Sequence, residues 1–330
     1  MSIEEIVQTI NLKKWFPVRR GFFSSLFSKK QLFIKAVNGV NFTIKKGEIF
    51  GLAGESGCGK TTTGKLLVRL LEPTEGKILF KGEDISHYKG KKLRAFRRKA
   101  QMIFQDPYES LNPRLRIYDA IAEPLRVQKI VTNHEEEREK VYSALEVVHL
   151  TPPEEFSERY PHELSGGQRQ RVAIARALVV NPEFIVADEP VSMLDVSIRA
   201  SILNLLLEIR EKFRVAILFI SHDLSVESYV SDRMAIMYLG EIVELGPTEK
   251  ILNNPIHPYV QALIAAIPSS NPLRRKRRKP LKGEPPNPIN LPPGCSFSPR
   301  CPYANERCKR EKPFLEEIEP NHYVACFLAQ

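Results

Sequence analysis

A short glycine-rich stretch near the start of the chain has the residue types and spacing that bind a nucleoside triphosphate. Gly54, Gly59, Lys60 and Thr61 match the pattern GxxxxGK[ST]. Glycines let backbone N–H groups wrap phosphate oxygens, the lysine reaches the β and γ phosphates, and the threonine hydroxyl ligates Mg²⁺. The pattern therefore predicts a site for ATP and Mg²⁺. The other loop residues expected to line it are Glu55, Ser56, Gly57, Cys58 and Thr62, with Cys58 as a small filler.

Two adjacent carboxylates further along supply groups that phosphate hydrolysis needs. Asp188 and Glu189 follow the apolar run FIVA, which is typical of a buried strand. Asp188 is expected to hold Mg²⁺ through water, and Glu189 to orient and polarise the water that attacks the γ phosphate. His222 ends a second apolar run, AILFI. A lone histidine is more often a core or surface residue than a catalyst, so His222 needs further support.

A second glycine pair lies between these two motifs. Ser165, Gly166, Gly167 and Gln168 precede RQRVAIARAL, a run that fits a helix with its apolar residues on one face. The N-terminus of a helix carries free N–H groups and the positive end of the helix dipole. The stretch therefore predicts another anion-binding point.

The elements that must position these groups predict an α/β fold. An apolar strand at 49–53 leads into the glycine-rich turn, and an apolar-periodic helix follows Lys60. The chain has 330 residues, more than one ordinary domain needs. The composition changes past Ile267, where a proline-rich, basic stretch begins. We therefore expect a main domain at 1–267 and a small irregular extension at 268–330.

The LSGGQ stretch at 164–168, together with the P-loop and the acid pair, resembles the ATP-binding-cassette ATPases. Three further family motifs occur in order, with Gln105 in MIFQDP, Asp195 in SMLDVS and His222 in FISHDL. The resemblance implies a P-loop NTPase cassette, with a RecA-like core, an antiparallel β layer and a helical subdomain at about 107–178.

The resemblance also implies roles for individual residues. Lys60, Glu189 and His222 would be catalytic, with His222 as the γ-phosphate sensor, and Gln105 would contact nucleotide and Mg²⁺. Phe16 would stack on adenine, with Trp15 as the neighbouring alternative. In this family two cassettes pair head to tail around ATP. The residues that would contact the nucleotide from the signature and D-loop motifs are Ser165, Gly166, Gly167, Gln168 and Asp195.

Nearly the whole chain resembles the ATPase subunits of dipeptide and oligopeptide importers. The stretches that carry this are KKWFPVRRGFF, FQDPYESLNPR and NPIHPYVQALIAAIP, and the insertion at 17–34 resembles that of the second of two unlike ATPase subunits. The resemblance implies a heterodimer with a sister ATPase, on two membrane-spanning permeases fed by an extracytoplasmic solute-binding protein. The segment after Gln105 would receive the permeases' coupling helices.

Charge and hydropathy indicate where in the cell the protein is expected to lie. No apolar run approaches the ~18 to 20 residues that span a bilayer, and Glu4 and Glu5 stand where a signal peptide would be basic. We expect a peripheral protein at the cytoplasmic face of the cell membrane. The net charge is +10 and is densest at 274–279. That run is interpreted as a solvated linker rather than a nucleic-acid site, with attraction to anionic lipid as a third reading.

Two alternatives to a peptide importer stay open. One is that this chain belongs to a same-family importer of oligosaccharides or of another solute. A soluble cassette ATPase acting on nucleic acid or ribosomes is more distant, because the single P-loop and the short span between Lys60 and Leu164 favour a transporter subunit. We expect no nucleic-acid partner.

Four of the chain's five cysteines are close together near the C-terminus, at Cys295, Cys301, Cys308 and Cys326. Thiols in a reducing compartment more often bind metal than form disulfides. Five, six and seventeen residues separate them, without a CxxC pair, so the spacing fits zinc less well than a [4Fe–4S] cluster. Related importer ATPases have a similar module holding such a cluster. The alternatives are a zinc ion, as the second choice, and thiols without a bound metal, as the third.

Overall fold

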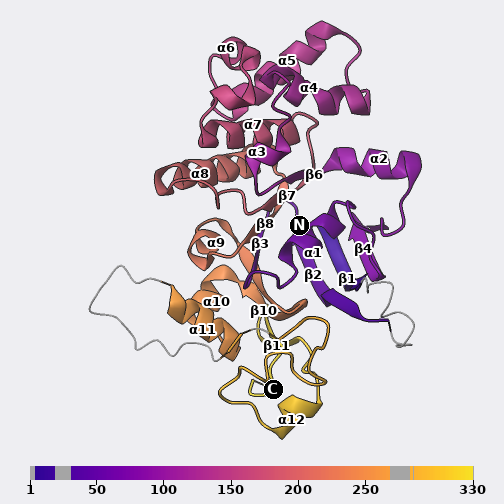
Figure 1. Ribbon diagram of the computed structural model, residues 1–330, viewed down its shortest axis with the longest axis vertical. Coiled ribbons are helices and arrows are strands. Elements are labelled where there is room, and N and C mark those ends of the chain that lie inside the picture. The colour runs from indigo at the N-terminus through magenta and orange to yellow at the C-terminus, as the bar shows by residue number, and fades with distance from the viewer. Residues whose placement is uncertain (1–3, 19–30, 268–282, 285, 330) are drawn as a thin grey trace, which may run out of the picture.

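The computed structural model describes residues 4–18, 31–267, 283–284 and 286–329. The basic run at 274–279 and most of the insertion at 17–34 lie outside these ranges. Figure 1 shows an elongated molecule, with a group of helices at one end and the C-terminal segment at the other. None of the described helices is long and apolar enough to cross a membrane.

Two sheets form the centre of the molecule. The smaller one is antiparallel and contains, in spatial order, β2 (Phe33–Lys45), β1 (Glu5–Pro17), β4 (Glu75–Phe80) and β5 (Glu83–Asp84). The larger one contains β11 (Glu316–Glu319), β12 (His322–Val324), β10 (Glu241–Pro247), β9 (Arg233–Tyr238), β3 (Ile49–Ala53), β8 (Ala216–Ser221), β7 (Phe184–Asp188) and β6 (Ala100–Ile103).

Helices cover the sheets and form the far end of the molecule. In chain order they are α1 (Lys60–Leu67), α2 (Gly90–Lys99), α3 (Pro107–Ser110), α4 (Ile117–Gln128), α5 (His134–Val147), α6 (Pro153–Glu158), the 3₁₀ turn η1 (Pro161–Glu163), α7 (Gly166–Leu178), α8 (Val196–Phe213), α9 (Leu224–Val230), α10 (Thr248–Asn253), α11 (Pro258–Ala266) and α12 (Glu306–Arg310).

The order of the parallel strands brings the motif residues to one edge of the larger sheet. Strands β9, β3, β8, β7 and β6 run parallel as neighbours, and β3, β7 and β8 are buried along their whole length. Apolar runs buried on both faces are typical of such strands. The carboxyl ends of parallel strands meet at the same edge, where ligands bind in open α/β sheets. The P-loop, the acid pair and His222 therefore follow adjacent strands.

Helices α3 to α7 lie between residues 107 and 178, where the sequence predicts a helical subdomain. Helices α4, α5 and α7 bury apolar residues in one core that continues beneath the main sheet, including Ile121, Leu145 and Val172. Strand β6 enters this region directly from the main sheet (Figure 1). The P-loop cassette architecture predicted from sequence is thus present, with the antiparallel β layer as its second sheet.

The C-terminal segment is partly irregular, but it also extends the main sheet. Strand β12 pairs with β10, and β11 pairs with β12. His322 and Glu244 are both fully buried where β12 meets β10, with the Nε2 of His322 2.8 Å from Oε1 of Glu244. A three-residue strand without apolar alternation gives too little periodicity for prediction, which is why the sequence indicated an irregular extension only.

Candidate nucleotide-hydrolysing site

The P-loop connects β3 to α1 and is pre-shaped around the side chain of Lys60. The ammonium of Lys60 donates hydrogen bonds to the carbonyl oxygens of Gly54, at 2.7 Å, and Glu55, at 3.1 Å. Gly59, which precedes α1, has a φ of +109°, and a Cβ there would lie 2.1 Å from the carbonyl oxygen of Ala36. Only glycine fits this close approach, so the loop's backbone remains free to wrap an anion at the helix N-terminus.

Thr61 and Asp188 form a pair of oxygen ligands suited to magnesium. The hydroxyl of Thr61 donates a hydrogen bond of 3.0 Å to Oδ1 of Asp188, which is buried at the end of β7. Burial raises the pKa of Asp188, the hydrogen bond from Thr61 lowers it, and the neighbouring Glu189 raises it again. Mg²⁺ prefers hard oxygen ligands and uses one or two carboxylates besides water and phosphate. The two side chains fit this ion, which would neutralise phosphate charge.

The carboxylate of Glu189 contacts the two other predicted site residues, Gln105 and His222. Its Oε2 accepts a hydrogen bond of 2.9 Å from Gln105 Nε2, and its Oε1 lies 3.1 Å from His222 Nδ1. Glu189 has a φ of +46°, an unusual value for a side chain with a Cβ, and its N–H is fixed by the carbonyl of Ile220. Such backbone conformations cost about 1–3 kcal/mol and cluster at functional sites.

These groups line one cavity of about 490 Å³ at the carboxyl edge of the sheet. Its lining is Ala36, Ser56, Gly57, Gly59, Lys60, Thr61, Thr62, Gln105, Glu189 and His222. The cavity combines phosphate-binding backbone, the ammonium of Lys60, the hydroxyl of Thr61 that pairs with Asp188, and a carboxylate that can polarise water. This set of groups is suited to hydrolysis of a nucleoside triphosphate.

Other predicted contacts lie elsewhere in the described structure. Ser165 caps α7 through a capping box with Gln168, so Gly166 and Gly167 begin the helix as predicted. Neither this stretch nor Asp195, which is exposed before α8, lines the P-loop cavity. Phe16 does not line it either.

The aromatic residues of β1 are paired with lysines. The ring of Phe16 has the ammonium of Lys14 5.2 Å from its centre, and the ring of Trp15 has those of Lys13 and Lys35 at 5.5 and 5.1 Å. These cation–π contacts hold both rings on the strand. The choice between Phe16 and Trp15 for adenine therefore stays a prediction.

Two residues that were not predicted as part of the site contact the P-loop, and a third residue contacts one of them. Arg300 binds both carboxylate oxygens of Glu55, at 2.8 and 3.2 Å, and Tyr259 accepts a hydrogen bond from the Glu55 N–H. Tyr238 lies beneath Arg300, with its hydroxyl 3.5 Å from Nη1. An arginine directly before a clustered cysteine, in the sequence PRC, was the available signal.

The four C-terminal cysteines lie near one another as free thiols. Burial raises the pKa of Cys295 to about 11, and the neighbouring sulfurs of Cys308, Cys326 and Cys301 also raise it. The N–H of Cys295 donates to the carbonyl of Cys308. Within the described ranges, however, no group of three or more His, Cys, Asp or Glu side chains is arranged to hold a metal ion. The predicted metal-binding character of the extension is therefore not supported by this geometry.

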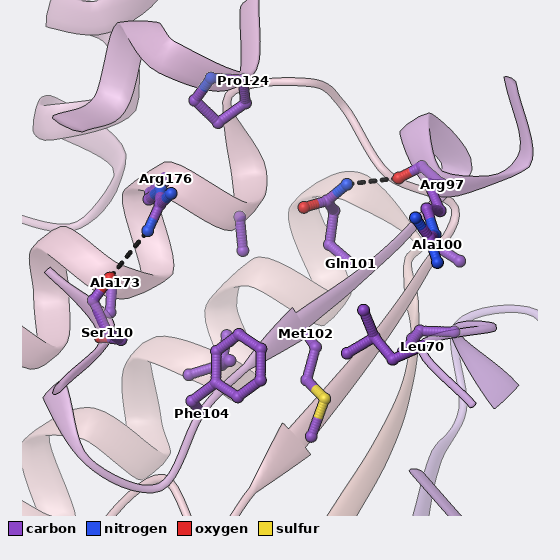
Figure 2. Close-up of a pocket in the computed structure, with 13 residues that line it drawn as sticks. Leu70, Arg97, Ala100, Gln101, Met102, Phe104, Ser110, Pro124, Ala173 and Arg176 are labelled. Carbon is purple, nitrogen blue, oxygen red and sulfur yellow. Dashed lines mark hydrogen bonds between the residues drawn. The ribbon is translucent and has the colours of Figure 1, made fainter. Parts of the chain in front are cut away.

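A second hollow, of about 210 Å³, lies beside the strand that leads to Gln105. Figure 2 shows Met102 and Phe104 of this segment facing the same space as Leu70, with Arg176 of α7 on the opposite wall. Arg176 is fixed there by a 2.8 Å bond to the carbonyl of Ser110. The hollow lies between the main sheet and the helical subdomain. It presents exposed apolar surface, since Phe104 is 42% exposed.

The fold and this site define an ATP-binding-cassette ATPase. A family model described as "ABC transporter" matches residues 37–192, and one described as "Oligopeptide/dipeptide transporter, C-terminal region" matches 243–308. The chain is 50% identical to the oligopeptide transport ATP-binding protein AppF of Bacillus subtilis, over 98% of both chains. It belongs to the family of oligopeptide and dipeptide transport ATP-binding proteins.

Further comparisons agree with this family. The chain is 46% identical to the dipeptide transport ATP-binding protein DppF of Haemophilus influenzae, over 98% of this chain and 96% of the relative. Among solved structures, it resembles the dimeric post-hydrolysis state of the cassette MJ0796 bound to ADP and Pi, with a TM-score of 0.63 and 29% identity over 74% of this chain and 99% of that one. It also resembles cbiO1 of Clostridium perfringens, with a TM-score of 0.64 and 25% identity over 76% and 92%.

Proposed function

We propose that this protein hydrolyses ATP to power the import of peptides across the cell membrane. The observation that carries the hydrolytic part is the meeting of Gln105 and His222 on the Glu189 carboxylate, next to Lys60 and the Thr61–Asp188 pair. Peptide as the solute is supported by the names of relatives at 46 to 50% identity over nearly the whole chain.

Each side chain takes a part that its geometry supports. Lys60 neutralises phosphate charge, and Thr61 with Asp188 holds Mg²⁺. Glu189 accepts the proton of the attacking water, while Gln105 and His222 fix the direction of its carboxylate. A carboxylate held from both sides loses little orientational freedom when water binds, which favours a near-attack geometry.

Hydrolysis requires a second cassette in this proposal. The N-terminus of α7, with Ser165, lies outside the P-loop cavity of its own chain. It can add its N–H groups to a γ phosphate bound by another cassette. A dimeric cassette with 29% identity to this chain supports pairing. We infer that the partner is a sister ATPase, this chain being the second of the two unlike subunits.

The dimer would lie at the cytoplasmic face of the cell membrane and bind two membrane-spanning permeases, which an extracytoplasmic solute-binding protein supplies with solute. The hollow beside Met102 and Phe104 fits a short permease helix, because it offers exposed apolar surface between two parts of the cassette (Figure 2). It also lies on the segment that leads directly to Gln105. A helix seated there can bias the position of Gln105, which links the transport gate to nucleotide state.

Residues 1–267 would act as the hydrolysing unit and 268–330 as an appendage.

We propose that Cys295, Cys301, Cys308 and Cys326 bind a [4Fe–4S] cluster, with zinc as the alternative. Their proximity supports this, because Cys301, Cys308 and Cys326 all lie close enough to Cys295 to raise its pKa. Iron, acid-labile sulfide and zinc are measured per chain after purification without oxygen. Iron and sulfide near four each would support the cluster, and no metal would remove it.

Fractionation of cells with and without the neighbouring permeases tests the transporter class. The protein should sediment with membranes when the permeases are present and leave them when the permeases are deleted. Co-sedimentation with ribosomes or DNA at low salt would instead support a cassette ATPase that acts on nucleic acid, because such binding weakens as salt rises.

A further inference from the structure

The C-terminal extension contacts the nucleotide site through one buried arginine. The Arg300 side chain is 6% exposed, and its guanidinium makes two parallel bonds, of 2.8 and 3.2 Å, to the carboxylate of Glu55. Glu55 is the second residue of the P-loop pattern and is 245 positions away in the chain. Bidentate arginine–carboxylate pairs fix geometry as well as charge.

Arg300 is itself held in place by a tight turn. The N–H groups of Arg300 and Cys301 both donate to the carbonyl of Phe297, each at 3.0 Å. The ring of Phe297 is 1% exposed and packs on Tyr238 and Tyr259, with ring centres 5.3 and 5.4 Å apart. The turn is thus anchored in the cassette's own core, so the guanidinium has a fixed position.

Glu55 is held at three points, and one of them concerns the catalytic lysine. Its carboxylate binds Arg300, its N–H donates to the hydroxyl of Tyr259 at 3.0 Å, and its carbonyl accepts from the Lys60 ammonium at 3.1 Å. The contacts therefore form a continuous chain from the extension to the phosphate-binding cation. A shift of Glu55 would move a hydrogen-bond partner of Lys60.

We propose that Arg300 is a positioning residue of the nucleotide site, which fixes the entrance of the P-loop and cancels the charge of Glu55. The extension thereby sets the affinity of the cassette for MgATP. This inference rests on the proposed hydrolysis of ATP at the P-loop. It gives the C-terminal cysteine segment a role in nucleotide binding that does not depend on bound metal.

Electrostatics decides the direction of the effect. Without Arg300, a carboxylate that is 27% exposed would stay unpaired in the loop that receives a triphosphate. Like charges in a partly desolvated site repel, and a buried ion pair that loses one partner leaves an uncompensated charge. MgATP binding should therefore weaken, while the chemical step at Glu189, on another strand, should change less.

The test is the substitution Arg300→Met in the full chain, assembled with its partner ATPase. We expect the Kd of a fluorescent ATP analogue and the KM for MgATP to rise about tenfold, a typical size for coupling between neighbouring sites. The kcat should stay within about threefold. Arg300→Lys, which keeps the charge without the bidentate fork, should give an intermediate Kd.

A second pair of variants separates charge from folding. Glu55→Gln combined with Arg300→Met removes the unpaired carboxylate, so the double variant should bind MgATP more tightly than Arg300→Met alone. His322→Gln is the matched control, because this equally buried link from the extension ends on Glu244 and not on the P-loop. It should lower the thermal midpoint without raising the KM.

The outcomes are distinguishable. If Arg300→Met binds MgATP like the unchanged protein, or if His322→Gln raises the KM as much, the positioning role is wrong and the arginine only secures the extension. Full additivity of the Glu55 and Arg300 substitutions would contradict it as well. An unchanged protein that hydrolyses no ATP with its partner would instead overturn the proposed function itself.

Discussion

Glu189→Gln should abolish ATP turnover while leaving the nucleotide site assembled. Glutamine has the same shape, with one acceptor oxygen and one donor group. It can keep the bond from Gln105 Nε2, now 2.9 Å, and donate towards His222 Nδ1, now 3.1 Å. The P-loop contacts of Lys60 do not involve Glu189. The substitution therefore removes the proton acceptor and little else.

The magnitude follows from the loss of a general base. Such groups contribute about 10²- to 10⁴-fold to the rate, which corresponds to about 2.7 to 5.4 kcal/mol of barrier. Phosphate release by the paired ATPases is measured beside titration with a fluorescent ATP analogue. We expect kcat to fall by that factor with unchanged affinity. A fall of less than about tenfold, with the sister subunit's own site inactivated, would refute Glu189 as the base.

Three further changes test other parts of the structure. Burial raises the pKa of Glu227 well above its usual value, so the protein should lose stability as pH rises from about 4.3 towards that pKa. Glu227→Gln should remove this loss, and its thermal midpoint should therefore fall less than that of the unchanged protein between about pH 5 and pH 8. Gly59→Ala should abolish nucleotide binding in a titration, because its Cβ would lie 2.1 Å from the carbonyl oxygen of Ala36. Glu244→Gln should lower the free energy of local opening of β12 by about 3 kcal/mol, because the carboxylate accepts from two backbone N–H groups and His322. The measurement is amide hydrogen exchange in β12, which should become faster; an unchanged exchange rate would contradict the role of these hydrogen bonds.

The nucleotide site was predictable because its parts are local or follow from strand order. The P-loop is contiguous in sequence, and Glu189 and His222 each follow an apolar strand. Parallel strands place their carboxyl ends at one edge, so β3, β8 and β7 bring these residues together once the order is known. That order became known only from the fold, since periodicity alone does not give it.

The contacts of the C-terminal segment could not be predicted in the same way. Arg300 and Glu55 are 245 residues apart, and no local pattern specifies such a pairing. A second contact of this segment did have a signal in the sequence, because Glu244 interrupts the apolar stretch of β10 and a carboxylate in a buried strand must find partners. Its partners, the N–H groups of Ile256 and His257 and the ring of His322, became visible only in the fold.

Uptake of a labelled peptide into proteoliposomes shows whether ATP hydrolysis by this protein powers peptide import. The vesicles would contain the two permeases, the sister ATPase and this chain, with the solute-binding protein outside and ATP inside. We expect peptide accumulation that needs ATP and is lost in Lys60→Ala, while that variant stays bound to the permeases. Accumulation of an oligosaccharide but no peptide, or peptide uptake that persists in Lys60→Ala, would overturn the assignment as a peptide-importer ATPase.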